Sequence, residues 1–333
     1  MRVATAVSVR ALADLGISRN ASPGASPGRS GPGSWRDLRV RLISAGVLAP
    51  LGLACLLNGG WIFAGLVLLA MIGIGAEWAG LARLPARSTA ALTLLAWPGL
   101  SLLATLGTQD WLTGLRILLA GLLLGPFRGG GVVLIGLGGG ALIWLRGMTG
   151  TGTASLLFVV LVVWASDSMA YLVGRALGGA KLAPRISPGK TWSGAAGGLL
   201  GAMAAGAVVA ALVQPADMLE RPDLLEQIVR GLLFGGLLGI AAQAGDLAES
   251  ALKRRCGVKD SGRLIPGHGG LLDRLDGLFA AAPLAALLSL GCGYGQAFWQ
   301  FDPLHLRPLA LGSRHMPGGW LEGKIALARP RTP

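Results

Sequence analysis

Nine apolar runs separated by short polar gaps constrain this chain more than any other feature of its sequence. Most of them reach the roughly 17–25 residues that a helix needs to cross a bilayer, although the first, fourth, fifth and last are shorter. Only 14% of the residues are charged, against about 25% in an ordinary soluble domain. We therefore predict an all-α, polytopic integral membrane protein with about nine transmembrane helices. The runs fall at 42–57, 61–82, 89–106, 112–127, 130–146, 153–174, 192–213, 231–251 and 277–294.

Glycine is the second constraint, because it supplies 55 of the 333 residues. No Gly-x-y period is present, which excludes a collagen-like chain. Lipid tails remove the hydrophobic drive between membrane helices, so small residues there allow close backbone packing. We expect glycine-lined helix contacts inside the protein, and such faces also allow a homodimer.

The net charge of +13 would suggest nucleic-acid binding in a soluble protein. Here the cations gather between the apolar runs, as they do in membrane proteins with basic cytoplasmic loops. We therefore predict no nucleic-acid partner. Three cysteines, Cys55, Cys256 and Cys292, lie far apart and offer no disulfide framework or CxxC metal site.

Composition divides the chain into four parts. Residues 1–40 are rich in Arg and Ser and have few acids, which predicts a disordered basic tail and also fits an organelle transit peptide. No apolar segment precedes residue 42, so we expect no secretory signal. The remaining parts are the N-terminal transmembrane helices at 41–150, a catalytic transmembrane region with two cytoplasmic motif loops at 151–295, and a C-terminal tail at 296–333.

Lys and Arg in the gaps predict the orientation. With the N-terminus inside, nine crossings put the basic gaps at 175–191 and 252–276 in the cytoplasm. The loop 214–230 carries four acids against two arginines and falls outside. The C-terminal tail, with five Lys and Arg residues, also falls outside. Either the rule fails for that tail or the last run does not fully cross.

The first motif segment begins with Asp167 inside an apolar run. A carboxylate at membrane depth costs about 3 kcal/mol by insertion scales, which predicts a metal ligand or a hydrogen-bond acceptor. An ion pair with Arg175 or another helix is the structural alternative. Downstream, Ser187–Thr191 supplies hydroxyls and a lysine before a predicted helix, whose free N–H groups favour an anion. An ordinary positive-inside loop would also account for these cations.

The second motif segment, residues 245–277, concentrates acids and bases. Asp246, Glu249 and Lys253 fall at i, i+3 and i+7, on one face of a predicted helix. Asp273 and Asp276 repeat the i, i+3 spacing at the start of the next helix, and the Pro266–Gly270 turn returns the chain between them. Carboxylate oxygens suit Mg²⁺ with phosphate oxygens completing the shell.

His268 lies within that turn and has no second His or Cys at metal-ligand spacing. This pattern argues against zinc. It leaves three roles open: an acid–base group, a phosphate donor, or a constraint on the turn.

These residues carry a resemblance to a known family. The run Ser250-x-Leu252-Lys253-Arg254-x4-Lys259-Asp260-x-Gly262-x2-Ile265-Pro266-x-His268-Gly269-Gly270-x2-Asp273-Arg274-x-Asp276 resembles the signature of the phosphatidate cytidylyltransferases, or CDP-diacylglycerol synthases. Residues 167–194 are similar to that family's second block, except that Gly189 stands where its pattern has Lys. Glu77-Trp78 is a fainter similarity. The detailed resemblance covers residues 165–294.

The resemblance implies the reaction CTP + phosphatidate → CDP-diacylglycerol + diphosphate. It implies Mg²⁺, with room for a second cation, and an active site at the cytoplasmic face of a bacterial inner membrane. A CTP-dependent transferase acting on another lipid is the alternative within this class. A transporter is disfavoured, because the charges gather at one face and no inverted repeat is present.

The resemblance and the residue chemistry together predict three sets of site residues. The catalytic set is Asp246, Asp273, Lys253, Arg254 and His268. The metal set is Asp246, Asp273, Asp276, Glu249 and Asp167. The substrate set is Lys181, Arg185, Ser187, Pro188, Lys190 and Thr191 for the nucleotide, with Lys259, Asp260, Arg263 and Arg274 beside them. Within these sets Lys253, Arg254, Lys259 and Arg263 are assigned to the lipid phosphate or diphosphate.

Overall fold

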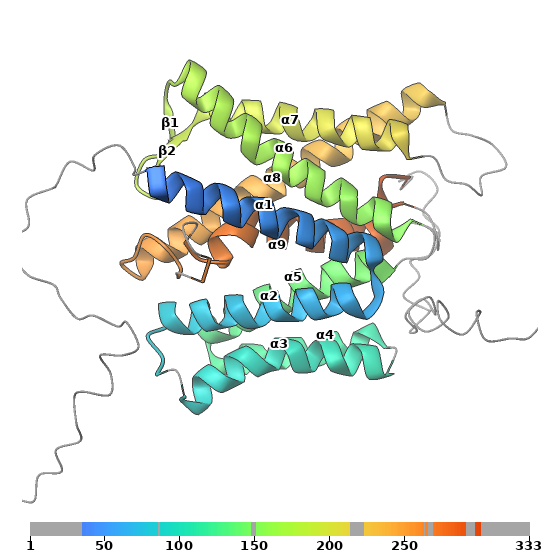
Figure 1. The fold of residues 1–333 in the computed structure, drawn as a ribbon. Coiled ribbons are helices and arrows are strands. Elements are labelled where there is room, and N and C mark those ends of the chain that lie inside the picture. Colours follow the sequence, from blue (N-terminus) through green and yellow to red (C-terminus); the bar gives the residue numbers. More distant parts are fainter. Residues whose placement is uncertain are drawn as a thin grey trace, which may run out of the picture.

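The computed structural model shows an α-helical bundle (Figure 1). It describes residues 35–85, 87–108, 110–147, 151–213, 223–262, 264–265, 269–290 and 297–300. Within these ranges the helices are α1 (Trp35–Asn58), α2 (Gly60–Leu81), α3 (Thr89–Thr108), α4 (Trp111–Ala120), α5 (Pro126–Gly147), α6 (Gly152–Leu177), α7 (Trp192–Leu212), α8 (Leu224–Arg255) and α9 (Leu272–Leu290).

Six of these helices are long and apolar enough to cross a membrane, judged by length and composition: α2, α3, α5, α6, α7 and α8. Two shorter apolar helices are also present: Gly46–Asn58 lies within α1, and Trp111–Leu124 covers α4 and the 3₁₀ turn that follows it. Helix α9 has 19 residues and carries Asp273, Arg274 and Asp276 near its start. The predicted all-α, polytopic membrane class is confirmed.

Two helices differ in extent from the apolar runs that predicted them. Helix α8 has 32 residues and continues past the run 231–251 at both ends. At its carboxyl end the last turns are charged yet remain helical, so hydropathy does not mark them. The run 112–127 is interrupted: α4 ends at Ala120, a 3₁₀ turn η2 covers Gly121–Leu124, and α5 starts at Pro126. Proline lacks an N–H and breaks a helix interior, but it is tolerated at the first position of a helix. Pro126 therefore cannot continue the preceding helix and begins α5 instead.

Within the gap 175–191, predicted as a loop, residues 181–191 form a small β-hairpin. Strand β1 (Lys181–Ala183) pairs antiparallel with β2 (Ser187–Thr191), with Lys181 opposite Thr191. The predicted helix start follows at once, because the Thr191 side chain caps α7 by accepting a hydrogen bond from the N–H of Gly194.

Glycines bring α6, α7 and α8 into backbone contact. A Cβ added at Gly231 of α8 would lie 2.5 Å from the carbonyl oxygen of Gly206 on α7, and one at Gly235 would lie 2.5 Å from that of Ala202. On the other side of α7, a Cβ at Gly201 would lie 2.9 Å from the carbonyl oxygen of Ala165 on α6. The prediction of glycine-lined helix contacts is confirmed within the chain.

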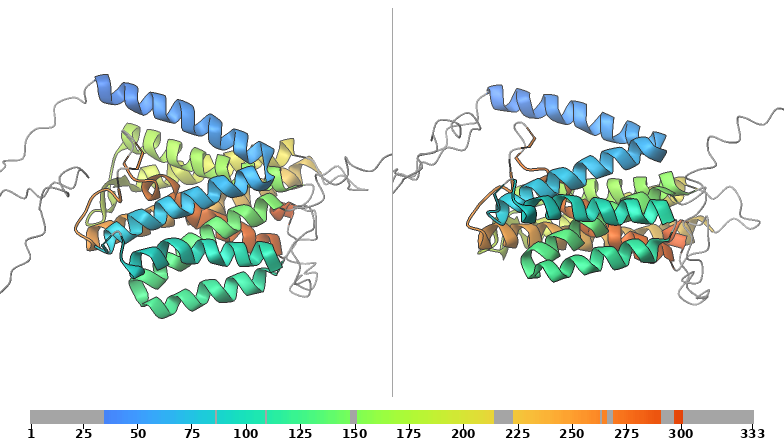
Figure 2. Two further views of the ribbon diagram at one scale, coloured as in Figure 1. Left: turned by 60° about the horizontal axis from the view of Figure 1, so that its bottom comes forward. Right: turned by 90° about the horizontal axis from the view of Figure 1, so that it is seen from below.

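The bundle places both motif segments at one of its ends. The β1–β2 hairpin, the end of α8 and the start of α9 lie together there, as Figure 1 shows. Helix α2 also ends on this side, whereas α1 runs along the edge of the bundle (Figure 2). At the opposite end, the first residues of the predicted C-terminal tail pack inward, and Trp299 stacks on Phe158 of α6 at 4.7 Å between ring centroids.

Candidate active site

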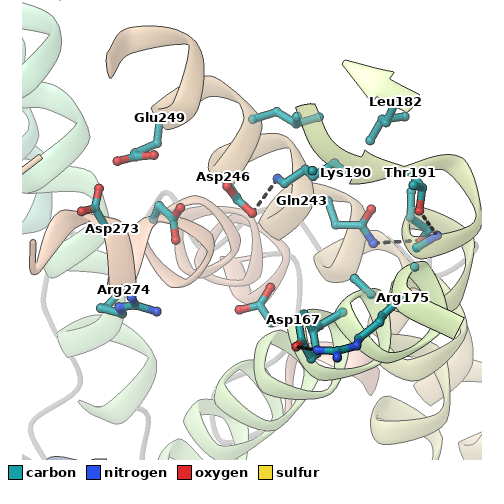
Figure 3. Close-up of a pocket in the computed structure, with 18 of the residues that line it drawn as sticks. Asp167, Arg175, Leu182, Lys190, Thr191, Gln243, Asp246, Glu249, Asp273 and Arg274 are labelled. Atoms are coloured by element: carbon teal, nitrogen blue, oxygen red, sulfur yellow. Dashed lines mark hydrogen bonds and ion pairs between the residues drawn. The ribbon is translucent and has the colours of Figure 1, made fainter. Parts of the chain in front are cut away.

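A cavity of about 860 Å³ opens at the end of the bundle that carries the motif segments (Figure 3). This volume suits a small-molecule ligand of nucleotide size. Helices α6, α7, α8 and α9 and strand β2 all contribute side chains to its wall. Its polar lining consists of Asp167, Tyr171, Arg175, Lys190, Thr191, Gln243, Asp246, Glu249, Lys253, Asp273, Arg274 and Asp276.

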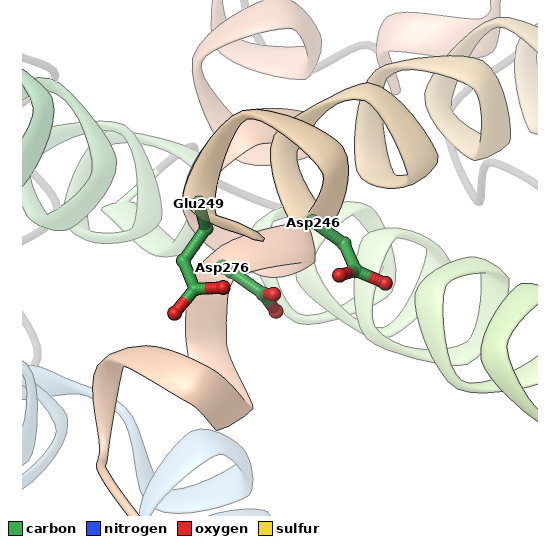
Figure 4. Close-up of side chains that lie close together, drawn as sticks. All are labelled: Asp246, Glu249 and Asp276. Carbon is green, nitrogen blue, oxygen red and sulfur yellow. The ribbon is translucent and has the colours of Figure 1, made fainter. Parts of the chain in front are cut away.

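Three carboxylates converge in this cavity, and we call them the open cluster: Asp246, Glu249 and Asp276. One carboxylate oxygen from each lies within 4.8 Å of the other two, as Figure 4 shows for the side chains. The first two lie one turn apart on α8, and the third projects from α9. Gly245 permits this approach, since a Cβ there would collide with the Cβ of Ala280 on α9.

The open cluster has few hydrogen-bond donors. Asp246 Oδ2 lies 2.5 Å from Lys190 Nζ, and Asp276 Oδ1 accepts from the N–H of Gly277 at 2.7 Å. Glu249 is 7% exposed, and its Oε1 is buried without a hydrogen-bond partner among the described residues. Carboxylate oxygens that face one another with few donors are the ligands that hard divalent cations prefer. The cluster could therefore bind a metal.

Asp273 has different partners, although the sequence predicts it alongside Asp246 as a metal ligand. Its Oδ1 accepts from Lys253 Nζ at 2.8 Å, and both of its oxygens accept from the Ser261 N–H at 3.2 Å. Oδ2 also accepts from the Gly270 N–H. Lys253 lies equally close to Glu249 Oε2, at 2.8 Å. Thus Lys253 lies partly buried between two carboxylates, and Asp273 is largely occupied by donors.

Asp167, the acid predicted from its position inside an apolar run, projects from α6 into the same cavity (Figure 3). Arg175, its predicted structural alternative partner, donates from Nη1 to the hydroxyl of Tyr171 at 2.8 Å. The structure therefore places Asp167 on the cavity wall opposite α8 and α9, in reach of a ligand that enters the cavity.

The predicted basic residues separate into groups. Lys190, Thr191 and Arg274 line the cavity. Arg254 is exposed and links the two motif segments, since Nε donates to the carbonyl of Ile186 in the hairpin and Nη1 to that of Val258. Lys181, Arg185, Ser187 and Pro188 belong to the hairpin, and Lys259 and Asp260 are exposed after α8; none of these six is part of the described lining. Arg263 and His268 lie outside the described residues.

Two polar residues near the site were not predicted from the sequence. Gln243 lies one turn before Asp246 on α8 and donates from Nε2 to the carbonyl of Ala195 on α7. Its position three residues before an acid on one helical face was the available signal. Glu77 of α2 is buried and accepts hydrogen bonds from the start of α9. Its signals were a carboxylate inside an apolar run and the faint family similarity at Glu77-Trp78.

Comparison of the sequence with known proteins identifies a family and several relatives. A family model described as "Cytidylyltransferase family" matches residues 39–290. A phosphatidate cytidylyltransferase of Brucella abortus is 41% identical over 262 residues, which cover 75% of this chain and 93% of that protein. One of Pseudomonas aeruginosa is 35% identical over 285 residues, covering 78% and 99%. One of Haemophilus influenzae is 44% identical over 133 residues, covering 40% and 44%.

Proposed function

The chain belongs to the cytidylyltransferase family, and from this premise we propose that it transfers the cytidylyl group of CTP to phosphatidate, giving CDP-diacylglycerol and diphosphate. The observation that carries the proposal is the convergence of both motif segments on one cavity lined by carboxylates and cations. The similarity to the Brucella and Pseudomonas proteins spans nearly their whole length, which supports the same reaction here.

The open cluster supports a magnesium site. Asp246, Glu249 and Asp276 offer three carboxylate ligand atoms, and Asp167 faces the same cavity, which leaves room for a second cation. The residues fit Mg²⁺ because it takes oxygen ligands and accepts substrate phosphates in its remaining positions. When bound, the ion would supply positive charge against the phosphates of CTP and the departing diphosphate.

The chemistry requires the chain's own residues mainly to bring anions together. An oxygen of the lipid phosphate attacks the α-phosphorus of CTP, and the bond from that phosphorus to the bridging oxygen breaks, so diphosphate leaves with the electron pair. The lipid phosphate is already an anionic nucleophile, and no general base is needed. Lys190, Arg175 and Arg274 on the cavity wall provide positive charge that holds the phosphates against their mutual repulsion.

The cavity wall also supports a lipid as the acceptor. Trp164 and Tyr171 of α6 line the cavity, and they are 49% and 61% exposed in the isolated chain. Helix α6 is one of the six candidate membrane spans, so these side chains join the cavity to a surface that lipid would cover. This arrangement favours an acceptor whose phosphate reaches the cavity while its tails stay in the bilayer.

The direct test uses protein purified in detergent, labelled CTP, Mg²⁺ and one lipid at a time. We expect a labelled CDP-lipid with phosphatidate, and none after chelation of Mg²⁺ by EDTA. Polyprenol phosphate and archaeol phosphate serve as competing acceptors. Preferential labelling of either of these would identify the protein as a CTP-dependent transferase acting on another lipid. Absence of any CDP-lipid would contradict the proposed function.

We further propose that the motif end of the bundle faces the cytoplasm of a bacterial inner membrane. In a chain whose native cysteines are replaced by serine, Gly189→Cys and Lys259→Cys should react with a membrane-impermeant thiol reagent only from the cytoplasmic side. Asn58→Cys, an exposed residue at the opposite end, is the matched control and should react from outside. Labelling of the first two from opposite sides would contradict the orientation.

A further inference from the structure

Glu77 is a buried carboxylate of α2 that reaches the second motif segment. It is 5% exposed. Its Oε1 accepts from the Leu271 N–H at 2.8 Å, and its Oε2 accepts from the Leu272 N–H at 2.8 Å and from the Ser261 hydroxyl at 3.0 Å. A buried carboxylate is tolerated only when such donors replace water, and here all of them come from one segment more than 180 residues further along the chain.

These contacts complete the amino-terminal cap of α9. The first N–H groups of a helix have no partner within it. At the start of α9, the N–H groups of Leu272 and of Leu271, the residue before the helix, bind Glu77, and the N–H of Gly270 binds Asp273. Negative charge is also favourable at this end of the helix dipole. Glu77 therefore fixes where α9 begins.

Two motif glycines make room for this carboxylate. A Cβ at Gly262 would lie 2.5 Å from Glu77 Oε1, and one at Gly270 would lie 2.8 Å from Oε2 and would also collide with the Ser261 hydroxyl. The segment between α8 and α9 is thus packed directly against the Glu77 side chain on both sides of its turn. This close approach explains why Gly262 and Gly270 are glycines.

We propose that Glu77 is a positioning residue of the cation site. By holding the start of α9, it sets the place of Asp276, which lies about one turn into that helix, relative to Asp246 and Glu249 on α8. Glu77 is absent from the described lining of the cavity, so it acts through α9 and touches neither cation nor substrate. The inference rests on the proposed cation site, and it assigns part of that site's geometry to the N-terminal half of the chain.

The test is Glu77→Gln, which keeps the size of the side chain but replaces one acceptor oxygen by an NH₂ group facing an N–H or O–H donor. Loss of a residue that orients metal ligands typically weakens metal binding ~10–100-fold. We expect Mn²⁺ binding, measured by electron paramagnetic resonance on the purified protein, to weaken ~10-fold. The Mg²⁺ concentration for half-maximal turnover should rise in parallel, and saturating Mg²⁺ should restore most of kcat.

Trp78→Phe is the matched control on the same helix, because Trp78 Nε1 donates to the carbonyl of Phe127 on α5 and not to α9. It should lower thermal stability without changing Mn²⁺ affinity. Wild-type Mn²⁺ affinity in Glu77→Gln, or an equal loss in Trp78→Phe, would overturn the proposal and leave Glu77 a purely structural residue.

Ser261→Ala decides the matter if Glu77→Gln does not fold. It removes one donor to Glu77 and keeps the Ser261 N–H that binds Asp273, so a smaller weakening of Mn²⁺ binding is expected and unchanged affinity would overturn the proposal. The Mn²⁺ measurement needs no turnover. A protein whose Mn²⁺ affinity depends on Glu77 but that makes no CDP-lipid would therefore contradict the proposed function and leave this inference standing.

Discussion

Two groups of carboxylates lie at the same end of the bundle and differ in their supply of donors. In what we call the anchored pair, Glu77 and Asp273, every carboxylate oxygen accepts at least one N–H or O–H hydrogen bond. In the open cluster, the described partners of Asp246, Glu249 and Asp276 are two lysines, one backbone N–H and the Ser250 hydroxyl, which donates a long hydrogen bond of 3.5 Å to Asp246 Oδ1.

The difference separates residues that fix a structure from residues kept for a ligand. A carboxylate whose oxygens are saturated by backbone donors stabilises its surroundings and has little capacity left for a cation. Carboxylates that face one another across a cavity repel unless positive charge is supplied. The two lysines supply part of that charge, and a bound cation would supply more. The contrast predicts that equivalent substitutions in the two groups have different consequences.

The largest effect is expected in the open cluster. Asp246→Asn and Asp276→Asn should each reduce turnover at least ~10²-fold, because each removes charge that holds a catalytic cation. Thermal stability without Mg²⁺ should be unchanged or higher, since repulsion in the cluster falls. Initial rates with phosphatidate and CTP, with melting curves on the same preparations, measure both quantities.

The double variant of these two residues should be hardly worse than either single one, as expected for groups that act as a unit. Near-normal turnover of either single variant at saturating Mg²⁺ would remove that residue from the cation site. Asp167 would then be the next candidate, because it faces the same cavity.

The anchored pair should respond in stability first. Asp273→Asn weakens the acceptor for the Ser261 and Gly270 N–H groups and leaves Lys253 with one carboxylate. For these partly buried groups we expect the free energy of unfolding to fall by about 1–3 kcal/mol. We expect a lower melting temperature. Turnover should fall only ~10-fold, because a displaced α9 shifts Asp276 within the cation site. If Asp273→Asn instead melts like the wild type and is as inactive as Asp246→Asn, Asp273 is a cation ligand, as the sequence predicts.

Much of the fold could be predicted from the sequence because it depends on local chemistry. The apolar runs located the helices, and the Ser187–Thr191 pattern located the start of α7. The extent of α8 could not be predicted from hydropathy, since its last turns are charged. They end at a glycine cap in which Gly257 adopts φ 75° and the Val258 N–H bonds to the carbonyl of Lys253.

The candidate site was only partly predictable, because spacing along one helix does not identify the partner on another. Asp273 and Asp276 have the same i, i+3 relation as Asp246 and Glu249, so the sequence treats them alike. Only the packing of α8 on α9 at Gly245 shows that Asp276, and not Asp273, joins Asp246 and Glu249 in the open cluster. Glu77 lies far from both motif segments in the chain, and no local pattern connects it to them.

The cations of the site should also fall into two groups, those that face the cavity and bind a ligand and those that hold the structure together. Lys190 tests the cavity-facing group. Lys190→Met removes the ion pair with Asp246 and a positive charge from the wall of the cavity. The pair is partly exposed, so it contributes only about 0–1 kcal/mol to stability. We expect the KM for CTP to rise about 5-fold, the size of one weakened charged contact, with little change in melting temperature.

Lys259→Met is the control for Lys190→Met, because it removes the same charge from an exposed position outside the described lining. It should leave the KM for CTP unchanged. An equal rise in both variants would show that net charge near the membrane, and not the cavity contact, attracts the nucleotide. A rise in the KM for phosphatidate alone would reassign Lys190 to the lipid.

The smallest effect is expected for Arg254, and it tests the other half of the division. The sequence predicts this residue as a phosphate ligand, whereas its guanidinium donates to the carbonyls of Ile186 and Val258 and so joins the hairpin to the end of α8. Exposed contacts of this kind contribute little, because water competes for the same donors. Arg254→Ala should therefore change turnover about 2-fold or less and leave the KM for phosphatidate in mixed micelles unchanged.

Arg254→Lys keeps the charge but cannot make both contacts, so it should resemble Arg254→Ala if the linkage is the whole role. If Arg254→Ala raises the KM for phosphatidate ~10-fold and Arg254→Lys restores it, the charge binds the lipid phosphate, and the contact with the hairpin is one that the lipid displaces.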